Sequence, residues 1–290
     1  MTLSTLPDVG GESNRSLYSP LVRCARAAGV VVFAALLMAL GAARAQADGH
    51  AVAVTSPAPA SLTAELYTPS GRGPFPTVIL MHGCGGVTPN VKAWAVWLRH
   101  EGYAAFVLDS FGGRGIRRLC AGSAELTGRM RAPDVFAAAD YLKRLPQVDS
   151  QHLAAMGFSH GGWTLLTSAS TEAKYPSASL RAFVLFYPSC GGFKRLPGST
   201  PVLILIGAKD DWSPAPPCQA LAQSAGAAGR PVRIVVYPNA YHHFDGAEVH
   251  KRTFVAEARG GRGATVDYDP RAHEDAEKQV RSFLAATLRP

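Results

Sequence analysis

The heptad GFSHGGW at residues 157–163 places a serine between glycines, where an apolar segment is followed by an uninterrupted helical pattern. In a G-x-S-x-G turn from a strand into a helix, the serine adopts a strained conformation and the glycines allow the two elements to approach closely. The apolar residues 153–156 and the residues 163–166 supply the strand and the helix start that such a turn requires. The pattern therefore makes Ser159 the candidate nucleophile.

Short apolar runs alternate with helical patterns over the rest of the chain. We expect strands at residues 62–67, 76–81, 104–108, 153–157, 182–187, 202–206 and 232–237, and helices at 91–99, 133–145, 162–170, 216–225 and 270–288. Asp269 and Pro270 are a cap and first-turn signal for the last helix. The alternation predicts an α/β fold, with a mostly parallel central sheet, helices on both faces and an active site at the carboxyl ends of the strands.

The first 45 residues have the features of a secretory signal peptide. Arg15, Arg23 and Arg26 precede an apolar run at residues 27–40, and Ala43-Arg44-Ala45 has the small-x-small form of a cleavage site. We expect cleavage after Ala45 and secretion to the periplasm or the exterior, and a retained membrane anchor is the alternative. The remaining residues 46–290, with no linker that would separate two parts, are expected to form a single domain.

Charge and composition exclude some functions. Cleavage would remove four arginines and two acidic residues, and the net charge would fall from +8 to +6. No dense Lys/Arg block interleaved with aromatic residues is present, so we expect no nucleic-acid partner. The sequence makes no prediction about the oligomeric state.

The loop HGCGG at residues 82–86 follows the predicted strand 76–81. Acyl transfer needs N–H donors held where the oxyanion of the tetrahedral intermediate forms. The N–H groups of Cys84 and His160 are the candidate donors, and the alternative is a glycine turn with no catalytic part. We expect His82 to orient the loop.

Two further loops after predicted strands carry an acid and a base. GAKDDWSP at residues 207–214 offers Asp210 and Asp211, of which the spacing within the turn favours Asp210, although both are also typical turn formers. YHHFDG at residues 241–246 offers His242 and His243. The resulting chain order of serine, aspartate and histidine is typical of one fold.

GFSHGGW, HGCGG, GAKDDWSP and YHHFDG, in this order, resemble the dienelactone hydrolase family of α/β-hydrolases, over roughly residue 62 to the last helix. The resemblance implies Ser159 as nucleophile, Asp210 as acid and His242 as base, because the family histidine is followed at the second position by phenylalanine, here Phe244. The chain departs from the founding enzyme in having serine in place of cysteine and no recognisable glutamate partner. The resemblance implies ester or lactone hydrolysis through an acyl-enzyme, without metal or organic cofactor.

Two other functions are compatible with the sequence. An acyltransferase or peptidase on the same fold would share every catalytic residue. A secreted binding protein could use His242, His243, Asp245 and His250 to hold a metal, although adjacent histidines place two rings on one ion with difficulty.

The residues that contact substrate are less clearly marked. Residues 111–131 follow a central strand and are expected to form a pocket wall or a lid. We expect Trp163 and Trp212 to line the pocket and Arg114 to meet an anionic substrate group, the alternative being a solvated arginine loop.

Cleavage of the leader would leave Cys84, Cys120, Cys190 and Cys218. Four cysteines allow three pairings, and an oxidising compartment favours disulfides. The strand order implied by the resemblance brings Cys190 beside Cys218 and Cys84 beside Cys120, so we expect these two bridges. Four separate buried thiols are the alternative.

Overall fold

The computed structural model describes residues 49–54, 61–122, 124–176 and 180–288. The predicted signal peptide and its cleavage site lie outside these residues. Residues Gly49–Pro290 make up one compact unit. Among the described residues, no helix combines the length and the apolar character needed to cross a membrane.

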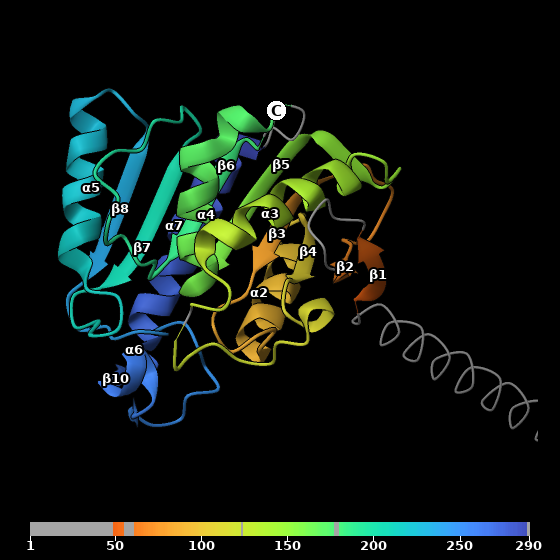
Figure 1. The fold of residues 1–290 in the computed structure, drawn as a ribbon. Coiled ribbons are helices and arrows are strands. Elements are labelled where there is room, and N and C mark those ends of the chain that lie inside the picture. The colour runs from red at the N-terminus through yellow and green to blue at the C-terminus, as the bar shows by residue number, and fades with distance from the viewer. Residues whose placement is uncertain (1–48, 55–60, 123, 177–179, 289–290) are drawn as a thin grey trace, which may run out of the picture. The chain divides into compact units, whose positions relative to one another are not determined.

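An eight-stranded sheet runs through the described unit in the order β1-β2-β4-β3-β5-β6-β7-β8 (Figure 1). Its strands are β1 (His50–Val54), β2 (Leu62–Tyr67), β3 (Phe75–Met81), β4 (Ala104–Asp109), β5 (Val148–Phe158), β6 (Ala182–Phe186), β7 (Val202–Gly207) and β8 (Val232–Tyr237). The strands β1, β2 and β4 pair antiparallel, and all pairings from β4 through β3 to β8 are parallel. The predicted fold class is therefore confirmed.

Helices cover the sheet. They are α2 (Pro89–His100), α3 (Gly128–Leu142), α4 (His160–Thr171), α5 (Ala215–Ala227), α6 (Ala258–Gly261) and α7 (Pro270–Leu288), with single 3-10 turns η1 (Gly112–Arg114) and η2 (Glu172–Lys174). Figure 1 shows α3 and α4 in front of the sheet and α7 behind it. Trp94 of α2 packs against His273 of α7 at 5.6 Å between ring centroids.

The core follows from the apolar runs of the central strands. β6 and β7 are buried along their whole length, which is typical of parallel strands covered on both faces. Asp269 Oδ1 accepts hydrogen bonds from the backbone N–H groups of Arg271 and Ala272, so α7 begins as predicted.

The main differences from the sequence-based prediction are in helix α3, in strand β1 and in the hairpin of β9 (Thr253–Val255) and β10 (Ala264–Val266), and β5 also begins earlier, at Val148. Helix α3 begins at Gly128 rather than Pro133, because the Thr127 side chain caps it by accepting from the Met130 N–H at 3.3 Å. β1 and the hairpin of β9 and β10 were not predicted. Each of these short strands is defined by hydrogen bonds to a second strand nearby in the chain, β1 to β2 and β9 to β10, and short strands of this kind carry little propensity signal of their own.

Candidate active site

Ser159 occupies the turn between β5 and α4 and has φ 52° and ψ −111°. Its N–H donates to the Phe186 carbonyl at the end of β6, which holds the strained turn in place. The flanking glycines are required by space, because a Cβ at Gly157 would lie 2.6 Å from the Gly161 carbonyl oxygen and one at Gly161 would lie 2.0 Å from that of Met81. The local sequence thus builds a sharp strand-to-helix turn with the serine at its tip.

His242 brings its imidazole to this serine. Its Nε2 lies 2.9 Å from Ser159 Oγ, and its Nδ1 lies 2.8 Å from Asp210 Oδ2. The ring is nearly enclosed, because Tyr187 packs on it at 4.6 Å and Trp212 at 4.9 Å between centroids. With Nδ1–H donating to the carboxylate, Nε2 is free to accept the serine proton.

Asp210 and Asp211 have separate partners. Asp210 is buried, and its Oδ1 accepts from the N–H groups of Trp212 and Ser213 at 2.9 and 2.7 Å, which leaves Oδ2 for the imidazole. Asp211 accepts instead from the N–H and hydroxyl of Thr265 at 2.7 and 2.9 Å, and so anchors β10.

His243 does not take part in this contact. It has φ 62°, its Nε2 lies 2.9 Å from Glu248 Oε1, and its Nδ1 lies 3.3 Å from the Tyr187 hydroxyl. Burial alone would lower the pKa of His243, but the hydrogen bond to Glu248 and the charge of Asp245 outweigh it and leave that pKa raised. The metal-binding alternative has no support in the described part of the chain, where no three His, Cys, Asp or Glu side chains gather as a ligand set.

The turn after β3 lies against the serine turn, because a Cβ at Gly83 would lie 3.3 Å from the Phe158 carbonyl oxygen and 3.5 Å from Ser159 Cβ. His82 is fully buried, its Nδ1 donates to the Gly83 carbonyl at 2.8 Å, and its Nε2 accepts from the Ser110 N–H at 3.3 Å. Burial, together with the charge of Arg131, lowers the pKa of His82, which keeps the ring neutral in this arrangement. His82 thus orients the loop, as the sequence suggests.

His160 offers its N–H at the first position of α4, where no intrahelical partner is available. Its side chain is held on both ring nitrogens: Nε2 donates to the Leu126 carbonyl at 2.9 Å and Nδ1 accepts from Arg131 Nη1 at 2.8 Å. Burial and the charge of Arg131 lower the pKa of His160 to about 3. The imidazole is therefore neutral and serves to hold the helix start.

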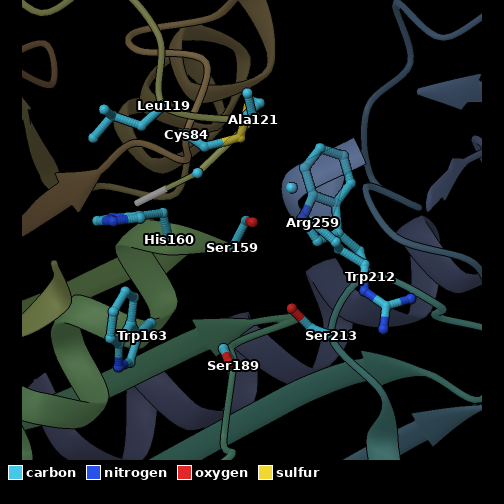
Figure 2. A pocket seen from close by; sticks show the side chains of 13 residues that line it. Cys84, Leu119, Ala121, Ser159, His160, Trp163, Ser189, Trp212, Ser213 and Arg259 are labelled. Atoms are coloured by element: carbon cyan, nitrogen blue, oxygen red, sulfur yellow. A yellow bond between two sulfur atoms is a disulfide. The ribbon is translucent and has the colours of Figure 1, made fainter. Parts of the chain in front are cut away.

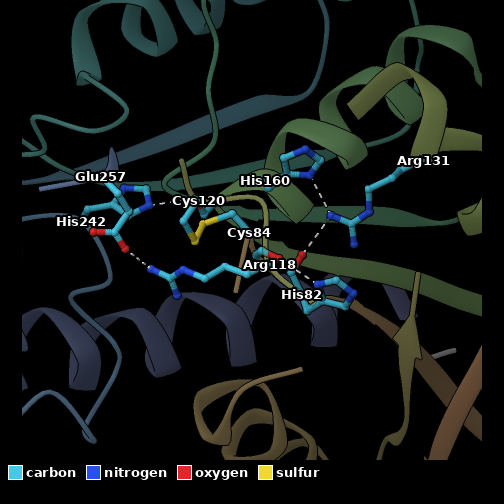
Figure 3. Close-up of a disulfide and its surroundings, with 10 residues drawn as sticks. His82, Cys84, Arg118, Cys120, Arg131, His160, His242 and Glu257 are labelled. Atoms are coloured by element: carbon cyan, nitrogen blue, oxygen red, sulfur yellow. Dashed lines mark hydrogen bonds and ion pairs between the residues drawn. A yellow bond between two sulfur atoms is a disulfide. The ribbon is translucent and has the colours of Figure 1, made fainter. Parts of the chain in front are cut away.

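Arg131 is a buried residue that the sequence analysis did not single out. Its Nη1 reaches both the His82 carbonyl and His160, and the guanidinium lies 4.9 Å from the Phe111 ring (Figure 3). Burial lowers the pKa of Arg131 to about 9 although Asp134 opposes the shift, so it remains charged at neutral pH. One side chain thus links the two segments that carry the candidate oxyanion donors.

Both expected disulfides are present. Cys84 pairs with Cys120 across 4.9 Å between Cα atoms, and Cys190 pairs with Cys218 across 5.1 Å. The first bridge joins the turn after β3 to the loop after β4, where the Leu119 N–H also donates to the Cys84 carbonyl at 2.8 Å. The parallel neighbours β3/β4 and β6/β7 bring each pair together, and the alternative of four separate thiols is wrong.

Ser159 opens onto two cavities. The larger, about 370 Å³, is lined by Cys84, Leu119, Cys120, Ala121, Gly122, Ser159, His160, Trp163, Ser189, Trp212, Ser213, Arg259 and Gly260 (Figure 2). The smaller, about 200 Å³, shares Cys84, Cys120, Ser159 and Trp212 and adds His242 and the apolar side chains of Val91, Phe158, Val255 and Val266, among others. Trp163 and Trp212 thus line the site as expected, and residues 119–122 form part of its wall.

The expectation for Arg114 is wrong. Its guanidinium pairs with both oxygens of Asp134 at 2.8 and 2.9 Å and donates to the Ser110 carbonyl at 2.6 Å. Because Asp134 is fully buried, Arg114 neutralises a charge in the interior. Arg114 lines neither of the two cavities beside Ser159. The arginine that lines the larger cavity is Arg259, which enters with α6, an element without a sequence signal.

The strained serine turn, the hydrogen-bonded histidine and aspartate and the parallel sheet define a serine hydrolase of the α/β-hydrolase class. Residues 62–288 match the family model described as the dienelactone hydrolase family. The chain belongs to that family, and it is a hydrolase that acts on ester or lactone bonds of small molecules.

Individual relatives are distant. A Yersinia pestis protein provisionally named carboxymethylenebutenolidase is 27% identical over 191 residues, which cover 60% of this chain and 70% of the relative. A dienelactone hydrolase-like promiscuous phosphotriesterase from metagenomic libraries superposes with a TM-score of 0.65 at 23% identity, covering 83% of this chain and 99% of the other. Thermogutta terrifontis esterase 2, phosphorylated by paraoxon, gives a TM-score of 0.61 at 16% identity over 83% and 96% of the two chains. The two structures support the fold.

Proposed function

We propose that the protein is a secreted serine hydrolase that cleaves a carboxylic ester or lactone through an acyl-enzyme on Ser159. The observation that carries the proposal is the unbroken contact from Ser159 Oγ through His242 to Asp210, at 2.9 and 2.8 Å. Nucleophile, base and orienting acid are within hydrogen-bond reach without rearrangement.

In the first half-reaction, His242 Nε2 accepts the Ser159 proton as Oγ bonds to the substrate carbonyl carbon. The oxyanion accepts hydrogen bonds from the N–H groups of Cys84 and His160. Nε2 then gives the proton to the leaving oxygen as its bond to carbon breaks. In the second half-reaction, water attacks the acyl-enzyme while Nε2 accepts its proton; the bond from carbon to Ser159 Oγ then breaks, Nε2 returns the proton to Oγ, and the acid product leaves. Asp210 holds the imidazole in the required tautomer and stabilises its cation.

Labelling with a serine-directed fluorophosphonate tests the nucleophile. The wild-type protein should be labelled at Ser159, as located by peptide mass spectrometry, and Ser159→Ala should lose labelling and on the order of 10⁴-fold in kcat. Ser170→Ala, whose hydroxyl bonds within its own helix, is the matched control and should remain labelled. A Ser159→Ala variant with unchanged esterase activity would overturn the assignment.

Secretion is supported by the leader pattern of residues 1–45 and by the two disulfides, which are typical of proteins in oxidising compartments. Expression of the full chain in a Gram-negative host should yield periplasmic protein whose N-terminus is Gln46. Protein that stays in the cytoplasm with its leader intact would contradict this part of the proposal.

A further inference from the structure

We infer that the two cavities beside Ser159 divide the substrate between them: the larger takes a polar acyl group, and the smaller takes a compact apolar alcohol. We call the larger cavity, with Trp163, Ser189 and Arg259, the acyl chamber, and the smaller, with His242 and Val255, the alcohol chamber. The inference rests on the proposed function, because it assigns the two halves of an ester.

The cavities meet at the nucleophile. Cys84, Cys120, Ser159 and Trp212 line both of them, so the Cys84–Cys120 disulfide forms a wall between two spaces that open on one hydroxyl. Figure 3 shows this bridge with His242 on one side and His160 on the other. A substrate bonded to Ser159 Oγ therefore has one space available in each direction.

The chemistry decides which half goes where. Once Oγ and the oxyanion occupy two positions on the tetrahedral carbon, the acyl substituent and the leaving oxygen occupy the other two. The leaving oxygen takes its proton from His242 Nε2, so it must lie within hydrogen-bond reach of that atom. Among the described residues, His242 lines the smaller cavity and not the larger one. The alcohol part must leave through the smaller cavity, and the acyl part is directed past His160 into the larger one.

The linings indicate the chemical class of each half. The acyl chamber is lined by Ser189, Ser213, Arg259 and Trp163, residue types that suit an acyl group with polar substituents. One nitrogen of Arg259, Nη1, also donates to the Asp211 carbonyl at 2.8 Å. Figure 2 shows Ser159 between Trp163 on one side and Arg259 and Trp212 on the other. The alcohol chamber is lined by the apolar side chains of Val91, Phe158, Val255 and Val266, and also by Thr88, Asn90, Arg118, Tyr187 and His243. Asn90, Arg118 and His243 are hydrogen-bonded to Asp245, Glu257 and Glu248, respectively, so the apolar side chains suit this chamber to a small apolar alcohol.

Two matched substitutions narrow one chamber each. Ser189→Phe fills space in the acyl chamber from an exposed position, and Val255→Phe fills space in the alcohol chamber from half-buried β9. Hydrolysis of four esters is followed by proton release: ethyl and benzyl esters of acetic and of cyclohexanecarboxylic acid. Ser189→Phe should lower kcat/KM for the cyclohexanecarboxylates at least tenfold more than for the acetates. Val255→Phe should lower it for the benzyl esters at least tenfold more than for the ethyl esters. The reverse pattern, or equal losses on all four, would overturn the assignment.

Kinetics of the acyl-enzyme distinguish the acyl part of the ester from the alcohol part, because the alcohol has already left when deacylation begins. In burst experiments with p-nitrophenyl cyclohexanecarboxylate, Ser189→Phe should slow the deacylation step more than Val255→Phe does, and the opposite order would contradict the inference. The preference of the acyl chamber for polar acyl groups is tested with the wild-type protein. Its kcat/KM should be higher for ethyl 3-hydroxybutanoate than for ethyl butanoate, and a lower value would contradict this preference.

A crystal structure of the wild-type protein tests the inference without relying on any variant. After reaction with a cyclohexyl phosphonate, the ring on phosphorus should lie beside Trp163 and Ser189, and a ring beside Val255 would overturn the inference. Failure of the proposed function has a different signature, in which the wild type hydrolyses none of the four esters and the phosphonate does not label Ser159.

Discussion

The Tyr187 hydroxyl donates a 2.7 Å hydrogen bond to the fully buried carboxylate of Asp245. The other oxygen of Asp245 accepts from the Asn90 side chain at 3.0 Å and from the Trp94 indole N–H at 2.7 Å, both on α2. The Tyr187 ring packs on His242, three residues before Asp245 in the chain. This carboxylate thus links the loop that carries His242 to α2 and to Tyr187, the residue directly after β6.

Asp245→Asn should destabilise the protein and loosen the base. The amide presents a donor where the carboxylate accepts three hydrogen bonds, so at least one buried donor loses its acceptor, at a cost of about 1–3 kcal/mol in the free energy of unfolding. We expect kcat to fall about ten- to a hundredfold, since small misplacements of a catalytic group are costly. Urea unfolding and steady-state kinetics measure the two effects. Asp140→Asn, at a surface ion pair, is the control, and equal behaviour of the two variants would contradict the prediction.

The His243–Glu248 ion pair should make stability depend on pH. The folded-state pKa of His243 is raised, so its contribution is complete below about pH 6.5 and is lost as pH rises through the raised value. Burial opposes the shift in Glu248, but the hydrogen bond from His243 lowers that pKa, so its contribution is lost as pH falls through acidic values.

The test is the difference in unfolding free energy between wild type and Glu248→Gln from pH 4 to 9. It should be largest between the two transitions, at most about 1 kcal/mol for a partly exposed pair, and should shrink at high pH. The groups that face the pair are Tyr187, Asp245 and His250. In a His243→Gln background, Glu248→Gln should give no such pH dependence; the same dependence there would assign it to another group.

The two disulfides should differ in their effect on catalysis. Removing either one, as Cys84→Ser/Cys120→Ser or Cys190→Ser/Cys218→Ser, should lower the free energy of unfolding by roughly 3–4 kcal/mol, since the closed loops have similar lengths. Only the first pair should lower kcat, by about tenfold or more, because Cys84 supplies a proposed oxyanion donor. Equal kcat losses in the two double variants would show that the first bridge has no special relation to the turn.

The effect of substituting Arg259 should depend on the charge of the substrate, whereas the effect of substituting Arg114 should not. Arg259→Ala should raise KM for esters with a carboxylate on the acyl part several-fold more than for neutral esters, because it is the charged side chain in the described wall of the larger cavity. Arg114→Ala leaves buried Asp134 unpaired and should cost about 3–5 kcal/mol of stability, with no distinction between the esters. Initial rates on a matched ester pair, with thermal unfolding, separate the two. Charge discrimination lost in Arg114→Ala would contradict the structure.

The sequence predicted a structural feature correctly where that feature depends on residues close together in the chain. The serine turn follows from glycines whose missing Cβ atoms allow close approach, and Ser159 was identified from that motif. Helix α7 was predicted from its cap and its periodicity. The predicted start of helix α3, Pro133, lies five residues after the observed start at Gly128, because the Thr127 side chain caps the helix earlier.

The sequence by itself determined the α/β alternation, the strand ends and the chain order of Ser159, Asp210 and His242, because periodicity and turn residues are properties of neighbouring positions. Only the tertiary structure decided what depends on partners distant along the chain. The buried Asp245 carboxylate accepts a hydrogen bond from Asn90, 155 residues away in the chain. Arg114 pairs with Asp134, 20 residues away, rather than with a substrate. A buried charge without a partner costs free energy. The role of a charged residue such as Arg114 therefore depends on which partner the fold places within reach.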